Sequence, residues 1–311
     1  MRKGKLLRLK LALGAIFTLG ATFAAQDARS DAPRPVTPAG SGFQGVYGVL
    51  PPDQVEFLST PTAIKSAVAT GASPLVWEVL EHGEKIECLD CIPAVAPLLY
   101  DSNAKTREIA AWWLRRRILG VFGPGEVYQQ TVQTLQTDTS PTRRAYAAYA
   151  LGEFFATPGI AACATALGTD TDAGVRAAAA SALGRLNSDG QGALGTALGD
   201  SDPGVKLAAL RSATQINSFS GLANVAALTV DPSAAVRRRA IETLDTLVAK
   251  DAVTAVAAAA QNDTDAGVRA EACHALGTFG DSSVLSVLQK LASSDPDTFV
   301  QDQAQIAMQR L

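Results

Sequence analysis

Two of the four cysteines form the most distinctive chemical motif in the sequence. Cys88 and Cys91 make a Cys-x-x-Cys motif in the segment ECLDCIP, at the entrance to an expected helix. Cysteines at this spacing can form a disulfide, cycle as a redox pair or contribute to a zinc site. We expect a structural disulfide, because Glu84, Glu87 and Asp90 surround the pair and oppose the thiolate that redox chemistry needs. A redox role and metal binding stay open as alternatives.

Zinc and covalent haem need ligands that are scarce near this motif. Only His82 lies close in the sequence, so a zinc site would also need a carboxylate such as Glu84. A c-type haem requires a histidine directly after the second cysteine, and Ile92 stands there. Cys163 and Cys273 are about 110 residues apart in different copies of the repeat described next, so we expect buried, unpaired thiols. The sequence therefore predicts no cofactor and no metal.

A repeat supplies the elements that position these and other side chains. An acidic turn, a short aliphatic-basic step and a small-residue helix recur seven times. The aligned step residues are separated by 37, 32, 30, 31, 32 and 32 residues and are Thr106, Arg143, Val175, Val205, Val236, Val268 and Val300. A near-constant period of this length is typical of α-solenoids, in which each helical hairpin buries its apolar face by stacking on its neighbours. We therefore predict an all-α fold, a right-handed α-solenoid of about seven stacked hairpins with an N-terminal helical cap.

Residue types within each copy predict a helical hairpin. Asp and Ser in the acidic turn are good caps for the second helix. Val175, Ala179 and Leu183 recur at i, i+4 and i+8 and give that helix one apolar face. We expect a glycine to help end the second helix in three copies, at Gly152, Gly184 and Gly277.

This pattern resembles the HEAT repeat, in the short alanine-rich variety of phycobilisome-lyase-like proteins, and the resemblance covers roughly residues 91–311. In that family the turn aspartate and the basic residue after the step form a ladder between neighbouring copies. The resemblance gives the basic role to Arg107, Arg144, Arg176, Lys206, Arg237 and Arg269. It gives the acidic role to Asp101, Asp138, Asp172, Asp202, Asp231 and Asp265, and the last copy has Gln301 in the basic position.

Two enzyme groups share the HEAT fold. Deoxyhypusine hydroxylases hold a di-iron centre on several His-Glu dipeptides. Here Gly83 follows His82 and Ala275 follows His274, so that activity is excluded. Bilin lyases and isomerases share the fold without a motif that transfers to this chain, and fold alone does not give function. We predict no catalytic residues.

The open face of the second helices carries the candidate partner-binding residues. Second helices usually line the concave surface of HEAT-like arrays, and alignment with Ala178, Ser181 and Arg185 gives the positions on that face. In the first two copies these positions hold Ile109, Trp112, Arg116, Tyr146, Tyr149 and Glu153. Aromatic residues and arginine are the usual anchors of protein interfaces. Burial of these side chains beneath the cap or beneath the segment 120–128 is the open alternative.

The N-terminal region contains no copy of the repeat. Residues 1–25 are typical of a cleaved signal peptide, because five basic residues precede an apolar run and Ala24 suits cleavage. Residues 26–52 are rich in Pro, Gly and Ser, which predicts a flexible linker. We assign residues 53–90 to capping helices and residues 91–311 to the repeat domain.

Charge and hydropathy limit the function classes. Loss of the signal peptide would leave 22 basic and 30 acidic residues, a net charge of −8, which argues against a nucleic-acid binder. The apolar run of the signal is too short to span a bilayer, so no membrane span is predicted. We expect a periplasmic or secreted, non-catalytic scaffold that binds a protein or peptide partner through its concave face. A lyase-like protein that handles a chromophore, haem or metal is the alternative, and the sequence fixes no oligomeric state.

Overall fold

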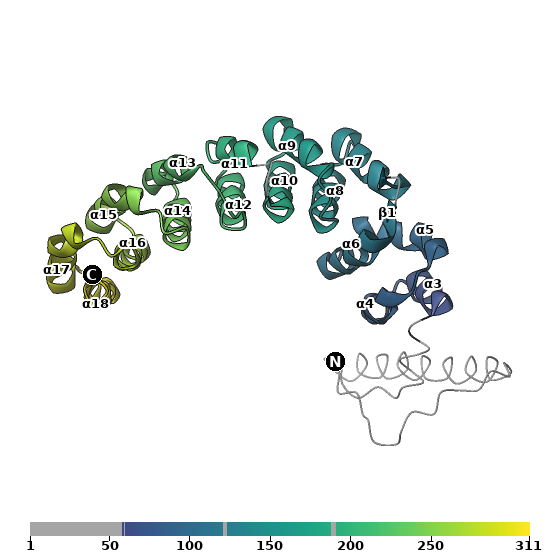
Figure 1. The fold of residues 1–311 in the computed structure, drawn as a ribbon, viewed down its shortest axis with the longest axis horizontal. Helices are drawn as coiled ribbons and strands as arrows, with labels where there is room; N and C mark the ends of the chain where they lie inside the picture. The colour runs from purple at the N-terminus through teal and green to yellow at the C-terminus, as the bar shows by residue number, and fades with distance from the viewer. Residues whose placement is uncertain (1–57, 59, 121–122, 188–190) are drawn as a thin grey trace, which may run out of the picture. The chain divides into compact units, whose positions relative to one another are not determined.

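The computed structural model describes residues 58, 60–120, 123–187 and 191–311 (Figure 1). The chain divides into two compact units, Met1–Pro97 and Leu98–Leu311. The expected signal peptide and linker lie outside the described residues. Across the described part of the chain, no helix combines the length and the apolar character needed to cross a membrane.

Short helices make up the described part of the first unit. α3 (Pro61–Thr70) and α4 (Ser73–His82) form a hairpin around Gly71, whose φ of 65° is left-handed and suits glycine. η1 (Gly83–Lys85), η2 (Leu89–Cys91) and α5 (Ile92–Val95) follow, and η3 (Ala96–Tyr100) runs across the boundary between the units. Ile64 and Val79 are fully buried and belong to the small core of this unit.

The second unit is a row of helical hairpins. It begins with α6 (Ala104–Ile118), and a short antiparallel ladder of β1 (Leu119–Gly120) and β2 (Gly123–Pro124) follows. Six hairpins come next: α7 (Glu126–Thr137) with α8 (Pro141–Glu153), α9 (Gly159–Thr169) with α10 (Ala173–Leu186), α11 (Gln191–Ala197) with α12 (Pro203–Ala213), α13 (Leu222–Ala227) with α14 (Ala234–Thr246), α15 (Val253–Asn262) with α16 (Ala266–Phe279), and α17 (Leu285–Ser294) with α18 (Thr298–Met308). Three single turns flank the first helices: η4 (Leu228–Val230), η5 (Lys250–Ala252) and η6 (Ser282–Val284). The prediction of an all-α repeat solenoid is confirmed.

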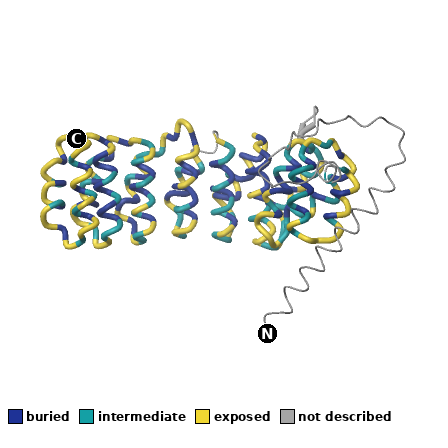
Figure 2. The backbone as a smooth tube through the Cα atoms, turned by 90° about the horizontal axis from the view of Figure 1, so that it is seen from below, coloured by how far each residue is buried: buried dark blue, intermediate teal, exposed yellow. Residues whose placement is uncertain are grey.

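The hairpins of the second unit form two layers. The first helix of each hairpin lies on the outer side of the curve of this unit; these are α7, α9, α11, α13, α15 and α17 (Figure 1). The second helix of each hairpin lies on the inner side; these are α8, α10, α12, α14, α16 and α18. Each second helix packs against the second helices before and after it. Exposed residues gather at the turns (Figure 2), and small side chains such as Ala179 and Ala272 lie in the interior.

The turns start the second helices as the residue types predict. Asp172 accepts a hydrogen bond from the Val175 N–H at 3.0 Å, and Asp265 accepts one from the Val268 N–H at 3.0 Å. A cap of this kind stabilises a helix by about 1 kcal/mol. The step residue that follows is fully buried in the last five copies, at Val175, Val205, Val236, Val268 and Val300.

Three glycines near the ends of the second helices serve helix packing. The expectation that they end the helices is wrong, because α8, α10 and α16 continue beyond them. A Cβ added to Gly184 would lie 2.5 Å from the Cβ of Ser212 in α12, and one added to Gly152 would lie 2.9 Å from the Cα of Ala182 in α10. A Cβ added to Gly277 would lie similarly close to α18. The missing side chain lets consecutive helices approach closely.

Candidate functional site

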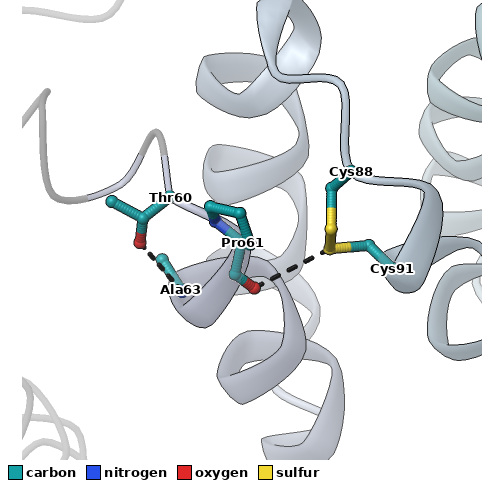
Figure 3. The surroundings of a disulfide bond; sticks show 5 residues. All are labelled: Thr60, Pro61, Ala63, Cys88 and Cys91. Atoms are coloured by element: carbon teal, nitrogen blue, oxygen red, sulfur yellow. Dashed lines mark hydrogen bonds between the residues drawn. A yellow bond between two sulfur atoms is a disulfide. The ribbon is translucent and has the colours of Figure 1, made fainter.

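A disulfide joins Cys88 and Cys91 in the first unit (Figure 3). Both residues are buried, and their Cα atoms are 5.3 Å apart. The Sγ atom of Cys91 lies 3.8 Å from the carbonyl oxygen of Pro61, which places the bond against the start of α3. Both thiols are consumed by this bond, so in this state neither can ligate a metal or attack a substrate.

The two remaining cysteines are buried free thiols. Cys163 lies on α9 and Cys273 lies on α16, and both are fully buried. Burial raises the pKa of each thiol to about 12. A thiol in this environment is protonated at neutral pH and is therefore a poor nucleophile.

A ladder of charged side chains connects consecutive turns of the second unit. Arg144 donates from Nε and Nη2 to the two carboxylate oxygens of Asp170, at 2.7 and 2.8 Å. Its Nη1 donates to the carbonyl oxygen of Asp138 in the preceding turn, at 2.9 Å. The same three bonds recur for Arg176 with Asp200, Arg237 with Asp263 and Arg269 with Asp295. Each arginine therefore links two turns.

Lys206 takes the ladder position with a simpler contact. Its Nζ donates to Asp231 Oδ2 at 2.6 Å, and both side chains are largely buried. An ammonium group lacks the planar fork with which a guanidinium binds both carboxylate oxygens. The Lys206–Asp231 pair therefore has the least favourable geometry of the ladder pairs that join consecutive turns.

The acidic partners differ from the expected set. From the turn at Asp170 onward, the carboxylate of the first aspartate accepts the ladder residue of the preceding copy. Asp101 and Asp138, also expected as acidic partners, accept Arg107 and Arg144 at the carbonyl oxygen instead, and the Asp138 carboxylate pairs with Arg143. Where the turn has a second aspartate, that residue caps the following helix. The expected partners Asp172, Asp202 and Asp265 are wrong, because each of them caps a helix. The acceptors in the corresponding turns are Asp170, Asp200 and Asp263.

A sequence signal for the correct partner existed. Asp138 and Asp231 are the first aspartates of turns whose second polar residue is a serine, at Ser140 and Ser233. The first aspartate is therefore present in every one of the turns, and the second is replaceable. The Oδ1 atom of the first aspartate also accepts a hydrogen bond from the N–H two residues further on, as Asp138 does from Ser140 at 2.8 Å. In that turn the side chain of Ser140 caps α8.

The ladder lowers the pKa of its aspartates. The hydrogen bonds from Arg144 hold the pKa of Asp170 below its usual range, and Arg269 does the same for Asp295. Burial acts in the opposite direction on Asp263, but the hydrogen bond from Arg237 and the contact with the Asp265 N–H outweigh it. The pairs are thus ionised at neutral pH.

The ladder changes at both ends. Arg107 donates to the carbonyl oxygen of Asp101 at 2.7 Å, and its guanidinium carbon lies 3.7 Å from the ring centroid of Tyr146. Gln301 donates to the carbonyl oxygen of Asp295 at 2.7 Å. Each end residue keeps the bond to its own turn.

Aromatic rings and arginines meet near the C-terminal ends of α6, α8 and α10. Arg115 on α6 lies 5.0 Å from the ring centroid of Phe155, which follows α8. Arg185 on α10 forms an ion pair with Glu153 and lies 5.9 Å from the ring centroid of Tyr149. Tyr149 is 47% exposed and Phe155 is 51% exposed. We call these five residues the aromatic–arginine patch.

The six residues expected to bind a partner differ in exposure. Tyr149 and Arg116 are exposed, Trp112 and Tyr146 are half-buried, and Ile109 and Glu153 are buried. Burial raises the pKa of Glu153, and Arg185 opposes that effect. Ile109 and Glu153 are thus corrected to interior positions, where neither can contact a partner directly.

Sequence reasoning missed Phe155 as a surface residue. The alignment of the open face ended at the position of Glu153, and Phe155 lies just beyond the helix. It is the exposed member of a Phe-Phe pair, since Phe154 is buried against Tyr128 with ring centroids 5.9 Å apart. Sequence alone does not tell which of two adjacent phenylalanines is buried.

One group of side chains has the composition of a metal site. Asp245 on α14 and Glu271 and His274 on α16 each offer one ligand atom within 4.8 Å of the others. His274 Nδ1 lies 3.1 Å from Asp245 Oδ2, and Arg310 lies 3.3 Å from His274 Nε2. Arg238 pairs with Glu271 at 3.3 Å. These contacts describe a polar bridge between helices, and two guanidinium groups beside it oppose a bound cation.

A hollow of about 550 Å³ lies in the outer layer between α9 and α11. Its walls are mostly small side chains, and the ladder residues Asp170, Arg176 and Asp200 line part of it. None of the residues of the aromatic–arginine patch lines this hollow. It therefore gives no support to a chromophore pocket beside the aromatic residues.

Comparisons with known proteins agree with the architecture. The sequence matches the HEAT repeats family over residues 128–194 and 221–309, which together make up just over half of the chain. No curated protein sequence matches it. The structure resembles the X-ray structure of Escherichia coli YibA at 18% identity, over 83% of this chain and 96% of that one, with a TM-score of 0.54.

Two other solved structures align with lower scores. Human deoxyhypusine hydroxylase aligns at 20% identity, over 82% of this chain and 96% of that one, with a TM-score of 0.36. The CpcE–CpcF complex of phycocyanin lyase from Nostoc sp. PCC7120 aligns at 18% identity, over 70% and 93%, with a TM-score of 0.39. We draw nothing on function from likenesses at this level. On its repeats and its family match, the chain belongs to the family of HEAT-repeat proteins.

Proposed function

We propose that this protein is an exported, non-catalytic scaffold that binds a partner protein through the inner layer of its second helices. The observation that carries the proposal is the aromatic–arginine patch. It leaves two aromatic rings about half exposed, Tyr149 on α8 and Phe155 just after it, and places a guanidinium group from α6 near one ring and one from α10 near the other. Exposed aromatic residues with arginines beside them are frequent anchors of protein interfaces.

The ladder supports a scaffold role because it fixes the helices relative to one another. Largely buried ion pairs join consecutive turns from Arg144 to Asp295. A surface held in this way loses little conformational entropy when a partner binds. The three ladder bonds of each arginine thus favour rigid display over a mobile catalytic loop.

Affinity capture from an envelope extract of the native host tests the proposal. The bait is the native chain, beside a variant with Arg115→Ala and Tyr149→Ala. A matched control changes an exposed arginine and an exposed aromatic residue elsewhere, Arg211→Ala with Phe299→Ala. We expect a protein that the native chain and the control retain and the patch variant loses.

Other results of the same capture would contradict the proposal. Equal retention of the partner by all three baits would show that the patch is not part of the interface. A bound chromophore, haem or metal in place of a protein would favour the cofactor-handling alternative.

Export is a separate part of the proposal. We expect the chain recovered from the periplasm or the medium to begin at Ala25, after loss of the signal peptide. N-terminal sequencing of the recovered chain tests this. A chain that keeps residues 1–24 and stays with the cytoplasmic fraction would contradict it.

A further inference from the structure

Glu153 is the buried acidic member of the aromatic–arginine patch. It is the last residue of α8, and its side chain is 7% exposed. It forms an ion pair with Arg185 of α10, whose side chain is 35% exposed. The residues at the same position of the other copies are uncharged or basic, and they are Arg116, Arg185, Gln215, Thr246, Thr278 and Arg310. Glu153 is therefore the single carboxylate at this position of the repeat.

The ion pair determines where the guanidinium of Arg185 lies. The guanidinium carbon is also 5.9 Å from the ring centroid of Tyr149, which is at the outer limit of a cation–π contact. The ring alone is therefore a weak anchor. Because the Arg185 side chain is partly exposed, its guanidinium can turn into solvent once Glu153 no longer attracts it. The ionised carboxylate thus keeps Arg185 beside Tyr149.

The surroundings of Glu153 make this carboxylate sensitive to pH. Burial is the largest effect and raises the pKa of Glu153. Arg185 and Arg115 favour the ionised form, whereas Glu108 of α6 opposes it. The C-terminal end of α8 carries the negative end of the helix dipole, which also opposes a negative charge. Glu153 therefore binds a proton more readily than an ordinary glutamate does.

The outer helices α7 and α9 also pack against α8. Their buried titratable groups are Tyr128 and Cys163, and burial raises the pKa of each to about 12. Both are neutral at neutral pH and in acid. Glu126 of α7 is exposed and accepts a hydrogen bond from Gln130. The charge balance at Glu153 is thus set by the groups of α6 and α10.

We infer that Glu153 is a positioning residue whose ionised carboxylate holds Arg185 beside Tyr149 in the arrangement that the partner protein binds. Uptake of one proton by the Glu153 carboxylate breaks the ion pair and frees Arg185. The partner is then released as the surroundings become acidic. The inference rests on the proposed function and adds proton-controlled regulation to it.

An NMR titration of the exported chain tests the link between Glu153 and Arg185 without a partner. The carboxyl carbon signals of glutamate and the Nε–H signals of arginine are followed as the pH falls, and Glu153→Gln and Arg185→Gln assign the two signals. We expect the Arg185 signal to shift with the midpoint of Glu153. Arg185→Gln should raise that midpoint, because Arg185 favours the ionised form. An Arg185 signal that does not follow the titration of Glu153 would overturn the inference.

The variant Glu153→Gln separates positioning from folding. A carboxylate whose pKa is raised in the folded state contributes stability below the pKa of an unfolded glutamate and loses it as the pH rises. We therefore expect Glu153→Gln to keep or raise Tm at pH 7 while it weakens partner binding. The matched control is Glu242→Gln, which removes a 43% exposed side chain paired with Arg239 on the inner layer and should change neither value. A fall of both Tm and affinity in Glu153→Gln would assign this residue to folding alone.

The protein recovered by affinity capture is the probe for the binding step. We expect its affinity for the native chain to fall below the midpoint of Glu153 by up to about tenfold per pH unit, the limit for one linked proton. Glu153→Gln should bind it weakly at every pH, and Glu242→Gln should follow the native chain. Binding by the native chain that does not depend on pH, or equal binding by the native chain and Glu153→Gln, would overturn the inference.

The two experiments keep the inference and the proposed function apart. If the capture retains no partner, the proposed function fails and the regulation of binding fails with it. The NMR titration then still decides whether Glu153 positions Arg185. If a partner is retained and its binding does not respond to Glu153, the proposed function stands and the inference fails.

Discussion

The guanidinium of Arg269 binds both carboxylate oxygens of Asp295, twenty-six residues further along the chain, at 2.8 Å each. Both residues are buried, and the Arg269 Nη1 also holds the carbonyl oxygen of Asp263 at 3.0 Å. One side chain thus links two consecutive turns. Repetition of this link along the second unit makes its inner layer a preformed surface.

Removal of a ladder arginine should destabilise the protein strongly. We expect Arg176→Ala to lower the free energy of unfolding by about 3 kcal/mol, because it leaves the Asp200 carboxylate largely buried and without its partner. Urea unfolding measures the change. The control is Arg143→Ala, which removes the exposed pair with Asp138 and should cost less than about 1 kcal/mol. Equal losses in the two variants would contradict the structural role of the ladder.

Replacement of Lys206 by arginine should strengthen the ladder contact with Asp231. We expect Lys206→Arg to raise the free energy of unfolding by about 1 kcal/mol, because it adds a second bond to Asp231 and a bond to the carbonyl oxygen of Asp200. The converse change, Arg237→Lys, should lower it by a similar amount. The same urea titrations report both values. A loss of stability in Lys206→Arg would show that lysine is required there.

Stability should fall in acid. The ladder lowers the pKa of Asp170, Asp200 and Asp295 in the folded state, whereas an aspartate of the unfolded chain titrates near about 3.9. The unfolded state therefore binds more protons below that pH. The contribution is fully present above about pH 5 and is lost as the pH falls through the lowered pKa values.

Urea midpoints measured between pH 7 and pH 3 check this dependence. Arg176→Ala should show a shallower fall, since Asp200 no longer has a strongly lowered pKa. The same acid dependence in the native chain and the variant would show that other carboxylates control acid unfolding.

The cysteines should not react with thiol reagents in the folded protein. Cys163 and Cys273 are buried with a pKa raised to about 12, and Cys88 and Cys91 are joined. A thiol reagent at pH 8 should therefore label no cysteine in the native chain, two after unfolding, and four after unfolding with a reductant. Reversible reduction of the native disulfide by mild dithiothreitol would revive the redox alternative.

The repeat pattern predicts some features well because their cause is local. The burial of Val175 follows from its place on the apolar stripe, and the cap at Asp172 follows from the preference of aspartate for that position. The choice between Asp170 and Asp172 as ladder acceptor depends on the geometry of a turn. The resemblance assigned Asp172 wrongly, although the presence of the first aspartate in every turn was a sequence signal for Asp170.

The candidate site was harder to predict than the fold. Tyr149 could be placed on the open face by its register, but the burial of Ile109 depends on how α6 is covered. Phe155 depends on a left-handed residue that only the three-dimensional path of the chain reveals. The proposed site depends on exceptions to the repeat, and the repeat pattern describes only what the copies share.

Photo-crosslinking in the native host tests the central claim, that a partner protein binds the inner layer at the aromatic–arginine patch. A benzophenone amino acid replaces Tyr149 in one variant and Gln130, an exposed residue of α7 in the outer layer, in the other. We predict a defined protein adduct from position 149 that is absent from position 130. No adduct from position 149, or the same adducts from both positions, would contradict the account.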